Sequence, residues 1–211
     1  MNASSLAALT PARRKQIVQL FHGLQTTRPV LNFVRVMPRI YSHKPLSFSG
    51  GPSRFSPLKP NQGRNGLFGV IYLAIDLATS VYETVIRDQF DLNPSRLLSP
   101  PNYLGHDAVN ISTSTVHALT LLDLSQGNAV RCGVPTDVIR YSMHTDGQYF
   151  SEFVHGEMPA VDGFLYHSRL TERTCIAIYD RACHKLTATP PMPLTKPLLA
   201  SALLPWNVSI L

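Results

Sequence analysis

The sequence predicts an α+β fold, and three observations support this class. Several short apolar runs are typical of strands, among them GVIYLA at 69–74 and CIAIY at 175–179. Helices are expected after Leu9, Ile75 and Val134, without the regular strand–helix alternation of a doubly wound sheet. No G-x-G-x-x-G motif follows a strand, so the chain lacks the signature of a Rossmann fold.

The first expected element is a helix from Thr10 to about Leu24. Thr10 suits the N-cap position, and Pro11 suits the first helical position. The predicted apolar face is formed by Ile17, Val18, Leu20, Phe21 and Leu24. We assign residues 1–31 to an accessory N-terminal helix that either packs on the domain or makes an oligomer contact.

A strand is expected next, over residues 30–37, and it carries Arg35. This arginine lies between Val34 and Val36, and a guanidinium buried in so apolar a run needs a partner. Two interpretations follow. Arg35 is either an edge-strand residue with its head in water, or a cleft residue whose charge is satisfied by a bound phosphate.

Residues 42–69 are expected to be irregular, because they hold four prolines and five glycines. Irregular segments of this length inside a compact domain are usually functional or disordered. Arg54 lies here in the run SRFSP, and the fork of an arginine suits phosphate. Arg64, which follows a glycine, is an alternative for the same role, and the sequence does not separate the two.

The run 69–74 predicts a buried strand that feeds a helix ending near Phe90. Asp76 suits the N-cap of this helix. Its apolar stripe is formed by Ala78, Val81, Tyr82 and Val85. Glu83 lies about 140° round the helix from Ala78, so it is expected outside the apolar stripe. Taken alone, such a glutamate is usually solvated.

The second half is expected to contain a loop, two helices and three strands. In chain order these are a loop at 93–107, a strand at 116–124, a helix at 135–143, a helix at 146–155, and strands at 164–166 and 175–179. His117 within the first of these strands is expected to be a satisfied core histidine. Ser168 follows the second strand directly, where a serine is commonly a turn residue. Beyond Leu186 a proline-rich apolar tail, 187–211, is expected to pack on the domain or on a partner.

Charge and cysteine content narrow the functional classes. The net charge is +6 and the pI is about 9.4, which allows a polyanionic ligand. The basic residues are scattered and are not interleaved with aromatic residues, so direct nucleic-acid binding is not expected. Three cysteines without a C-x-x-C pair fit reduced thiols in a cytoplasmic protein. We see no secretory signal and no membrane-spanning segment, and we expect a cytoplasmic protein.

One group of histidines and carboxylates raises the question of a metal site: His144, Asp146, Glu152, His155 and Glu157. Their spacing matches no H-E-x-x-H or comparable ligand pattern. We therefore expect no metal.

Five short pieces in order connect the chain to a known family. They are R-V at 35–36, S-R-F-S-P at 53–57, I-Y-L-A at 71–74, Y-E at 82–83 and G-F-L-Y-H-S at 163–168. This order resembles the RES domain, which is named for its arginine, glutamate and serine. The resemblance implies a catalytic domain over 32–186 with a fold like that of ADP-ribosyltransferase toxins, two small sheets around an NAD cleft with flanking helices.

The resemblance also implies the site. Arg35, Glu83 and Ser168 become the catalytic residues, and Arg35, Arg54, Tyr72 and Ser168 become the residues that bind NAD. Glu83 would stabilise the positive charge that develops on the ribose, and the arginines would bind the diphosphate. Tyr72 would stack on nicotinamide or ribose. The family typically has a glycine where this chain has Ser53, and the arginine and phenylalanine that follow are present here as Arg54 and Phe55.

Members of the family are toxins of bacterial toxin–antitoxin pairs. The implied activity is cleavage of the nicotinamide–ribose bond of NAD, with NAD as substrate and inorganic phosphate as a possible co-substrate. Phosphorolysis, hydrolysis and ADP-ribosyl transfer to a protein stay open, as does a non-enzymatic basic binding module. The implied partner is an Xre-type antitoxin that blocks the cleft, with a possible homodimer inside the complex and nucleic acid reached only through the antitoxin.

Overall fold

The computed structural model describes residues 9–48, 53–58, 68–90, 95–131, 134 and 144–211, and every structural statement below concerns these residues. The helical elements are α1 (Pro11–His22), η2 (Arg39–Tyr41), α2 (Leu77–Val81), η3 (Tyr82–Ile86), η4 (Arg87–Phe90), α3 (Pro100–Tyr103), α4 (Asn128–Arg131), α6 (Thr145–Glu157), η5 (Asp180–Lys185), α7 (Lys196–Leu203) and η6 (Leu204–Trp206). The strands are β1 (Gln25–Arg28), β2 (Phe33–Pro38), β3 (Val70–Ala74), β4 (Leu97–Leu98), β5 (His106–Thr113), β6 (Leu119–Asp123), β7 (Gly163–His167), β8 (Thr174–Tyr179), β9 (Leu186–Ala188), β10 (Met192–Pro193) and β11 (Ser209–Ile210).

Nine of the strands form one curled sheet in the order β1-β6-β7-β8-β3-β2-β5-β10, with β9 also paired to β5. Within this sheet β6 and β7 are parallel, and the other pairs are antiparallel. The strands β11 and β4 form a separate two-stranded sheet. The class predicted from the sequence, α+β, is therefore confirmed.

The expected pair of small sheets needs a correction. The described strands run through one nine-stranded sheet because β3 pairs with both of its neighbours. The two halves are nevertheless almost separate. The strands β3 and β8 share five paired positions, whereas β2 and β3 share only one, between Val34 and Ala74. The sheet is therefore split along the β2–β3 seam.

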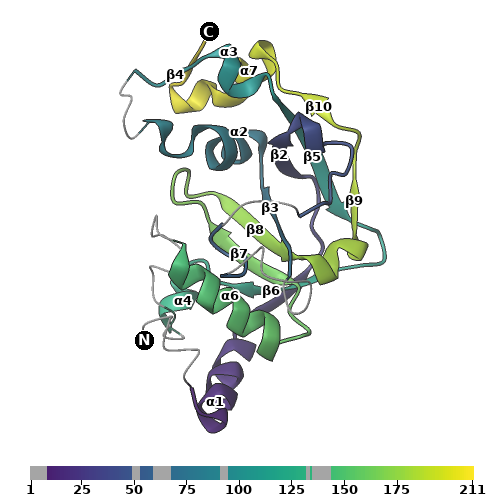
Figure 1. The fold of residues 1–211 in the computed structure, drawn as a ribbon, viewed down its shortest axis with the longest axis vertical. Coiled ribbons are helices and arrows are strands. Elements are labelled where there is room, and N and C mark those ends of the chain that lie inside the picture. Colours follow the sequence, from purple (N-terminus) through teal and green to yellow (C-terminus); the bar gives the residue numbers. More distant parts are fainter. Residues whose placement is uncertain (1–8, 49–52, 59–67, 91–94, 132–133, 135–143) are drawn as a thin grey trace.

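Figure 1 shows two groups of helices, with α1 and α6 at one end of the molecule and α2 and α7 at the other. Both groups pack on the same face of the sheet, because the paired residues Val34 and Ala74 belong to their two cores. The first group covers a core that contains Phe21, Phe150 and Phe164. The second covers a core that contains Val81 and Leu199. The opposite face has one continuous core drawn from strands of both halves. The gap between β2 and β3 thus lies between the two groups of helices, while the core on the opposite face of the sheet is continuous.

Most predicted elements are found close to their expected positions. The N-terminal helix begins after Thr10, whose side chain accepts a hydrogen bond from the Arg13 amide, and the helix after Asp76 is capped in the same way. Strands 69–74, 164–166 and 175–179 and the helix at 146–155 have counterparts. The strand expected at 116–124 begins only at Leu119, so His117, which was expected in the core, is exposed in the turn before it. The expected helix at 135–143 lies outside the described residues.

Six of the described strands were not predicted, and β1 and β5 are the longest of them. The strand β1 is short and polar, with the sequence QTTR, and it pairs only at the edge next to β6. The strand β5 begins inside the segment that was expected to be a loop, at His106. It pairs with β2 at six positions, and the strands β9 and β10 pair with it in turn.

The segment after Leu186 packs on the domain. Leu194, Leu199 and Leu203 are fully buried against the core under α2, and Trp206 packs at its margin. The longest described helix, α6, has 13 residues, and among the helices of these residues none is long and apolar enough to cross a membrane.

Candidate functional site

A cavity of about 440 Å³ lies at the split between β2 and β3. Ligand pockets typically have volumes of about 300–1,000 Å³. Its walls come from β2, β3, the helical segment after Asp76, the loop that follows η2 and the turn at 53–54. The lining residues are Arg35, Val36, Met37, Pro38, Tyr41, Ser47, Ser53, Arg54, Tyr72, Leu73, Ala74, Ser80, Glu83, Thr84, Arg87, His144, Tyr166 and Cys175.

The split brings side chains from both faces of the sheet into this cavity. Arg35 shares its face of β2 with Phe33 and Met37, which belong to the continuous core. Tyr72 lies on the opposite face, against the core under α6. In a fully paired sheet these two side chains would be separated by the backbone. Here the strands diverge beyond the Val34–Ala74 pair, so both side chains reach the same cavity.

Glu83 enters the cavity from a π-helical turn. The helix α2 begins at Asp76, whose carboxylate accepts a hydrogen bond from the Thr79 amide at 2.7 Å. After Val81 the helix widens into the π-helical segment 82–86, which contains Glu83. Short π-helical segments inside α-helices are frequently found at functional sites. The extra residue in the turn changes where Glu83 points, and a 3.6-residue period does not predict this.

Ser168 holds the Glu83 carboxylate in place. Its hydroxyl donates a hydrogen bond to Oε1 of Glu83 at 2.5 Å and accepts bonds from the amides of Leu170 and Thr171. Ser168 is 2% exposed and is not among the lining residues. The structure thus brings Ser168 to Glu83, and Ser168 contacts the cavity through this carboxylate. Direct contact of Ser168 with a substrate stays a prediction.

Arg54 lies on a tight turn at residues 53–56. The turn is closed by two bonds, from the Ser53 amide to the Ser56 hydroxyl and from that hydroxyl to the Ser53 carbonyl, each at 2.9 Å. The Nε atom of Arg54 is buried, and it has no hydrogen-bond partner among the described residues. A buried unpaired N–H of a cation costs free energy unless a ligand accepts from it. This is the strongest single indication of an anionic ligand.

Tyr72 supports the Arg54 turn from below. Its hydroxyl accepts a hydrogen bond from the Phe55 amide at 2.8 Å and lies 3.0 Å from the hydroxyl of Ser53. Burial raises the pKa of Tyr72, so the phenol stays protonated at neutral pH. Its ring lines the cavity, where a stacking role for it stays a prediction.

Arg35 is already partly engaged by the protein. Its Nη1 atom donates to the carbonyl oxygens of Pro45 at 2.6 Å and Ser47 at 2.7 Å. Burial lowers the pKa of Arg35 to about 10, so the guanidinium remains charged at neutral pH. Arg35 therefore shapes the loop beside the cavity as well as lining the cavity. The alternative arginine, Arg64, lies outside the described residues.

Sequence reasoning missed several cavity residues, and Arg87 is the most informative of them. It has a positive φ of 35°, which is uncommon for a residue with a side chain, and it ends the π-helical turn. It lines the same cavity as Arg54 and Tyr72, and its charge partly opposes the rise that burial causes in the pKa of Tyr72. Arg87 follows Glu83 by four residues, and this helical spacing was the available signal.

Tyr166 and Cys175 line the buried end of the cavity. Both are almost fully buried, and burial raises the pKa of each well above its ordinary value. The charge of the nearby Glu83 carboxylate also raises the pKa of both groups, and the charge of Arg54 opposes this rise. Neutral side chains at this end leave Glu83 and the arginines as the charged groups that face a ligand.

Among the described residues, no group of three or more histidines, cysteines and carboxylates lies close enough to hold a metal ion. Three of the five histidines and carboxylates discussed as a possible metal site have other contacts. The Glu152 carboxylate accepts from the Leu58 amide, Glu157 pairs with Arg14, and the His155 ring stacks on Phe68.

The fold is of the ADP-ribosyltransferase-like class: an α+β domain with a split sheet and a charged cavity at the split. A chain in the crystal structure of the M. tuberculosis MbcT–MbcA toxin–antitoxin complex has this fold. The two superpose with a TM-score of 0.59 over 88% of this chain and 96% of that one, at 14% sequence identity. This similarity confirms the predicted fold.

The family is shown by its sequence model. The RES domain model matches residues 32–197, and the chain belongs to the RES domain family that the five motifs predicted. A curated relative, the "Probable toxin y4kH" of Sinorhizobium fredii (strain NBRC 101917 / NGR234), is 37% identical over 78 residues. That match covers 36% of this chain and 60% of the relative, so it spans only part of that protein.

Proposed function

We propose that this protein is a toxin of a bacterial toxin–antitoxin pair that cleaves the bond between nicotinamide and ribose in NAD⁺. One observation carries the proposal: a single cavity holds the Glu83 carboxylate, fixed by Ser168, beside three arginines, and the buried Nε of Arg54 has no partner among the described residues. A dinucleotide supplies both complements, a diphosphate for the arginines and a ribose that becomes cationic as the bond breaks.

The chemistry follows from the charges. As the nicotinamide–ribose bond breaks, the electron pair leaves with nicotinamide, which departs as a neutral molecule. The ribose is left with oxocarbenium character, and the Glu83 carboxylate stabilises the developing positive charge. Ser168 keeps that carboxylate aimed at the cavity through its hydrogen bond. Water or inorganic phosphate then forms a new bond to the ribose carbon, and water in addition releases a proton.

The arginines bind and orient the substrate. Arg54 is best placed to contact the diphosphate because its buried Nε lacks an acceptor within the described part of the chain. Arg35 and Arg87 line the same cavity and add positive charge. The same groups would attract an incoming phosphate anion, which makes phosphorolysis the expected outcome when phosphate is present.

A partner that blocks the cavity is part of this proposal. The curated relative carries the name of a probable toxin, and the solved neighbour belongs to a toxin–antitoxin complex. An enzyme that depletes NAD in its own cytoplasm needs such an inhibitor. We propose an antitoxin of the Xre type, which would cover the mouth of the cavity near Tyr41 and also repress the operon.

The decisive experiment measures NAD⁺ consumption by purified protein, with and without inorganic phosphate, beside the variant Glu83→Gln. Glutamine keeps the size of the side chain and removes the charge that the oxocarbenium ion needs. We expect at least a 100-fold loss of rate in the variant, comparable to removal of one stabilising group in other enzymes. Product masses identify water or phosphate as the nucleophile.

The matched control is Glu157→Gln, which changes an exposed carboxylate on α6 paired with Arg14. It should retain the wild-type rate. If wild type and Glu83→Gln both leave NAD⁺ intact, even with host extract as a source of acceptor proteins, the proposed activity is wrong. Transfer of labelled ADP-ribose to an extract protein would instead support the alternative of a protein ADP-ribosyltransferase.

A further inference from the structure

The turn that presents Arg54 lies across one face of helix α6. Gln148, a buried residue of this helix, donates from Nε2 to the Ser53 carbonyl at 3.2 Å and to the Ser56 hydroxyl at 3.3 Å. These two acceptors close the turn on either side of Arg54. Gln148 is therefore bonded to both ends of the turn.

Two neighbours of Gln148 on the same helix face continue this contact. The hydroxyl of Ser151 donates to the Phe55 carbonyl at 2.7 Å, and the Glu152 carboxylate accepts from the Leu58 amide at 2.8 Å. Spacings of three and four residues place all three side chains on one side of α6. The helix thus fixes the backbone over residues 53–58.

The opposite side of the turn is held by the core. Phe55 is fully buried, and its ring lies 4.6 Å from that of Phe164 and 5.4 Å from that of Tyr166. Its amide donates to the Tyr72 hydroxyl. The backbone on both sides of Arg54 is therefore fixed by helix α6 above and by β3 and β7 below. Only the Arg54 head, with its unpaired buried Nε, is left for a ligand.

We propose that Gln148 is a positioning residue for Arg54: it holds the 53–56 turn so that the guanidinium faces the cavity before any ligand arrives. The proposal deepens the proposed function, on which it rests for the identity of the substrate. Its physical basis is preorganisation, because a turn already fixed loses little conformational entropy when an anion binds.

The test uses Gln148→Met, which keeps the approximate volume and removes the donor. Two readouts are followed in the purified full chain. One is the water-exchange rate of the Arg54 Nε–H signal in ¹⁵N NMR, assigned as the arginine signal missing from Arg54→Lys. The other is the Kd for inorganic pyrophosphate. We expect about tenfold faster exchange and about tenfold weaker pyrophosphate binding, since each hydrogen bond contributes about 1 kcal/mol and tenfold is about 1.4 kcal/mol.

Activity supplies a further readout that a purely structural role would not produce. The KM for NAD⁺ should rise about tenfold with kcat within about twofold of wild type, because Arg54 acts in binding. Glu157→Gln is the control on the same helix and should change neither quantity. Ser151→Ala, which removes one bond to the same turn, should shift both binding readouts in the same direction and serves if Gln148→Met does not fold.

Unchanged exchange and unchanged pyrophosphate affinity in a folded Gln148→Met variant would overturn the inference. The exchange rate of the Arg54 signal needs neither NAD⁺ nor turnover. If wild type fails to consume NAD⁺, the proposed function is wrong, whereas the exchange measurement still decides whether Gln148 positions Arg54.

Discussion

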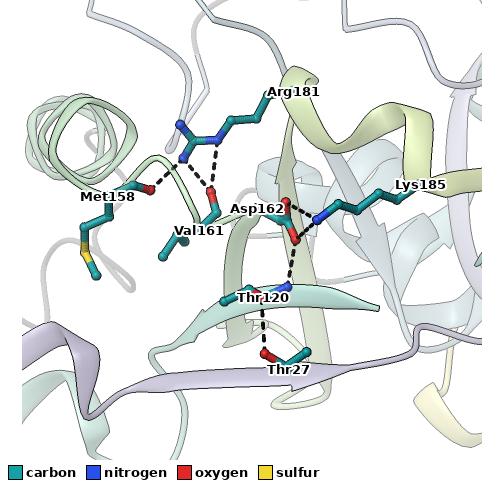
Figure 2. Close-up of polar contacts among 7 residues, drawn as sticks. All are labelled: Thr27, Thr120, Met158, Val161, Asp162, Arg181 and Lys185. Atoms are coloured by element: carbon teal, nitrogen blue, oxygen red, sulfur yellow. Dashed lines mark hydrogen bonds and ion pairs between the residues drawn. The ribbon is translucent and has the colours of Figure 1, made fainter. Parts of the chain in front are cut away.

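Two arginine sites in this domain differ in what satisfies the guanidinium group. Arg181 donates to the backbone carbonyls of His155, Met158 and Val161, and it lies 4.9 Å from the centre of the Tyr179 ring. Figure 2 shows part of this arrangement, with Arg181 directed at Met158 and Val161. Each of its side-chain nitrogens has a protein acceptor. The buried Nε of Arg54 has none within the described residues.

The surroundings of Arg181 extend the contrast. Asp162 nearby is buried, accepts two bonds from the Lys185 ammonium at 2.8 and 2.9 Å, and also accepts from the Thr120 amide (Figure 2). Charges there are matched by opposite charges or by backbone groups. In the cavity three arginines face one glutamate. The comparison teaches that an arginine whose donors are all bonded to the protein joins structural elements. An arginine with a buried donor that has no protein acceptor indicates a ligand.

The largest expected effect on stability comes from Arg181→Met. The variant leaves carbonyls at the end of α6 and in the following loop without donors, and unsatisfied buried groups cost about 1–3 kcal/mol each. We expect a loss of about 3 kcal/mol in the free energy of unfolding, measured by urea denaturation. Below the transition, NAD⁺ turnover should stay near the wild-type rate. Loss of turnover without loss of stability would show that Arg181 acts in the site.

Arg54→Met should show the opposite pattern. Removal of a buried donor without an acceptor should leave the free energy of unfolding unchanged or slightly higher. Loss of a charge-assisted contact to the diphosphate should lower kcat/KM for NAD⁺ about 100-fold, or about 2.7 kcal/mol. Parallel denaturation and turnover assays on this variant and Arg181→Met test the contrast directly. A large loss of stability in Arg54→Met would contradict it.

Ser168→Ala should have a smaller effect on activity. The hydroxyl fixes Glu83 without lining the cavity, so its loss should lower kcat about tenfold and leave the charge of Glu83 in place. A crystal structure or NMR spectrum of the variant should show more than one rotamer for Glu83. Ser168→Thr retains a hydroxyl and serves as the comparison. Equal losses in Ser168→Ala and Glu83→Gln would instead support direct contact of Ser168 with substrate.

The smallest expected effect concerns pH. Burial and the charge of Arg181 lower the pKa of His155 below its ordinary value, and its ring stacks on Phe68 at 4.2 Å. The unfolded chain therefore binds a proton at this residue more readily than the folded one. The contribution of His155 to stability is present above its unfolded pKa and is lost as the pH falls through the folded pKa.

His155→Phe should remove this dependence and keep the ring stack. Between pH 7 and pH 5 the Tm of wild type should fall by about 1–2 °C more than that of the variant, a difference of less than about 1 kcal/mol. His106 has a pKa lowered in the same direction by burial and contributes equally to both proteins. Differential scanning calorimetry at the two pH values measures the difference. Equal slopes would exclude a role for His155.

Local signals in the sequence predicted much of the fold. Asp76 was recognised as an N-cap because its short acidic side chain and the following apolar stripe lie within ten residues. The strand β8 was visible as the continuous run CIAIY, since it is buried on both faces. The polar strand β1 was missed because its place in the sheet depends on pairing with β6, which lies about 95 residues further along the chain.

The site was predicted less completely, for the same physical reason. The residues Arg35, Arg54, Tyr72 and Glu83 were named from motifs, and the structure gathers all four at one cavity. Their partners could not be predicted, because the Ser168–Glu83 bond spans 85 positions and the Gln148 bonds to the turn span more than 90. The π-helical turn was hidden as well, since a hydrophobic stripe does not show where an extra residue enters a helix.

The split between β2 and β3 has a consequence for solubility. Two strands that part expose backbone edges inside the molecule, and an open edge is a template for a foreign strand. The amide of Val36 in β2 already has a hydrogen-bond partner, because it donates to the Ser80 hydroxyl of α2 at 2.9 Å. The Ser80 hydroxyl thus satisfies one backbone donor at the edge of β2 and fills little of the gap between β2 and β3. The gap stays accessible to a small molecule, while one position at which an aggregating strand could pair is already taken.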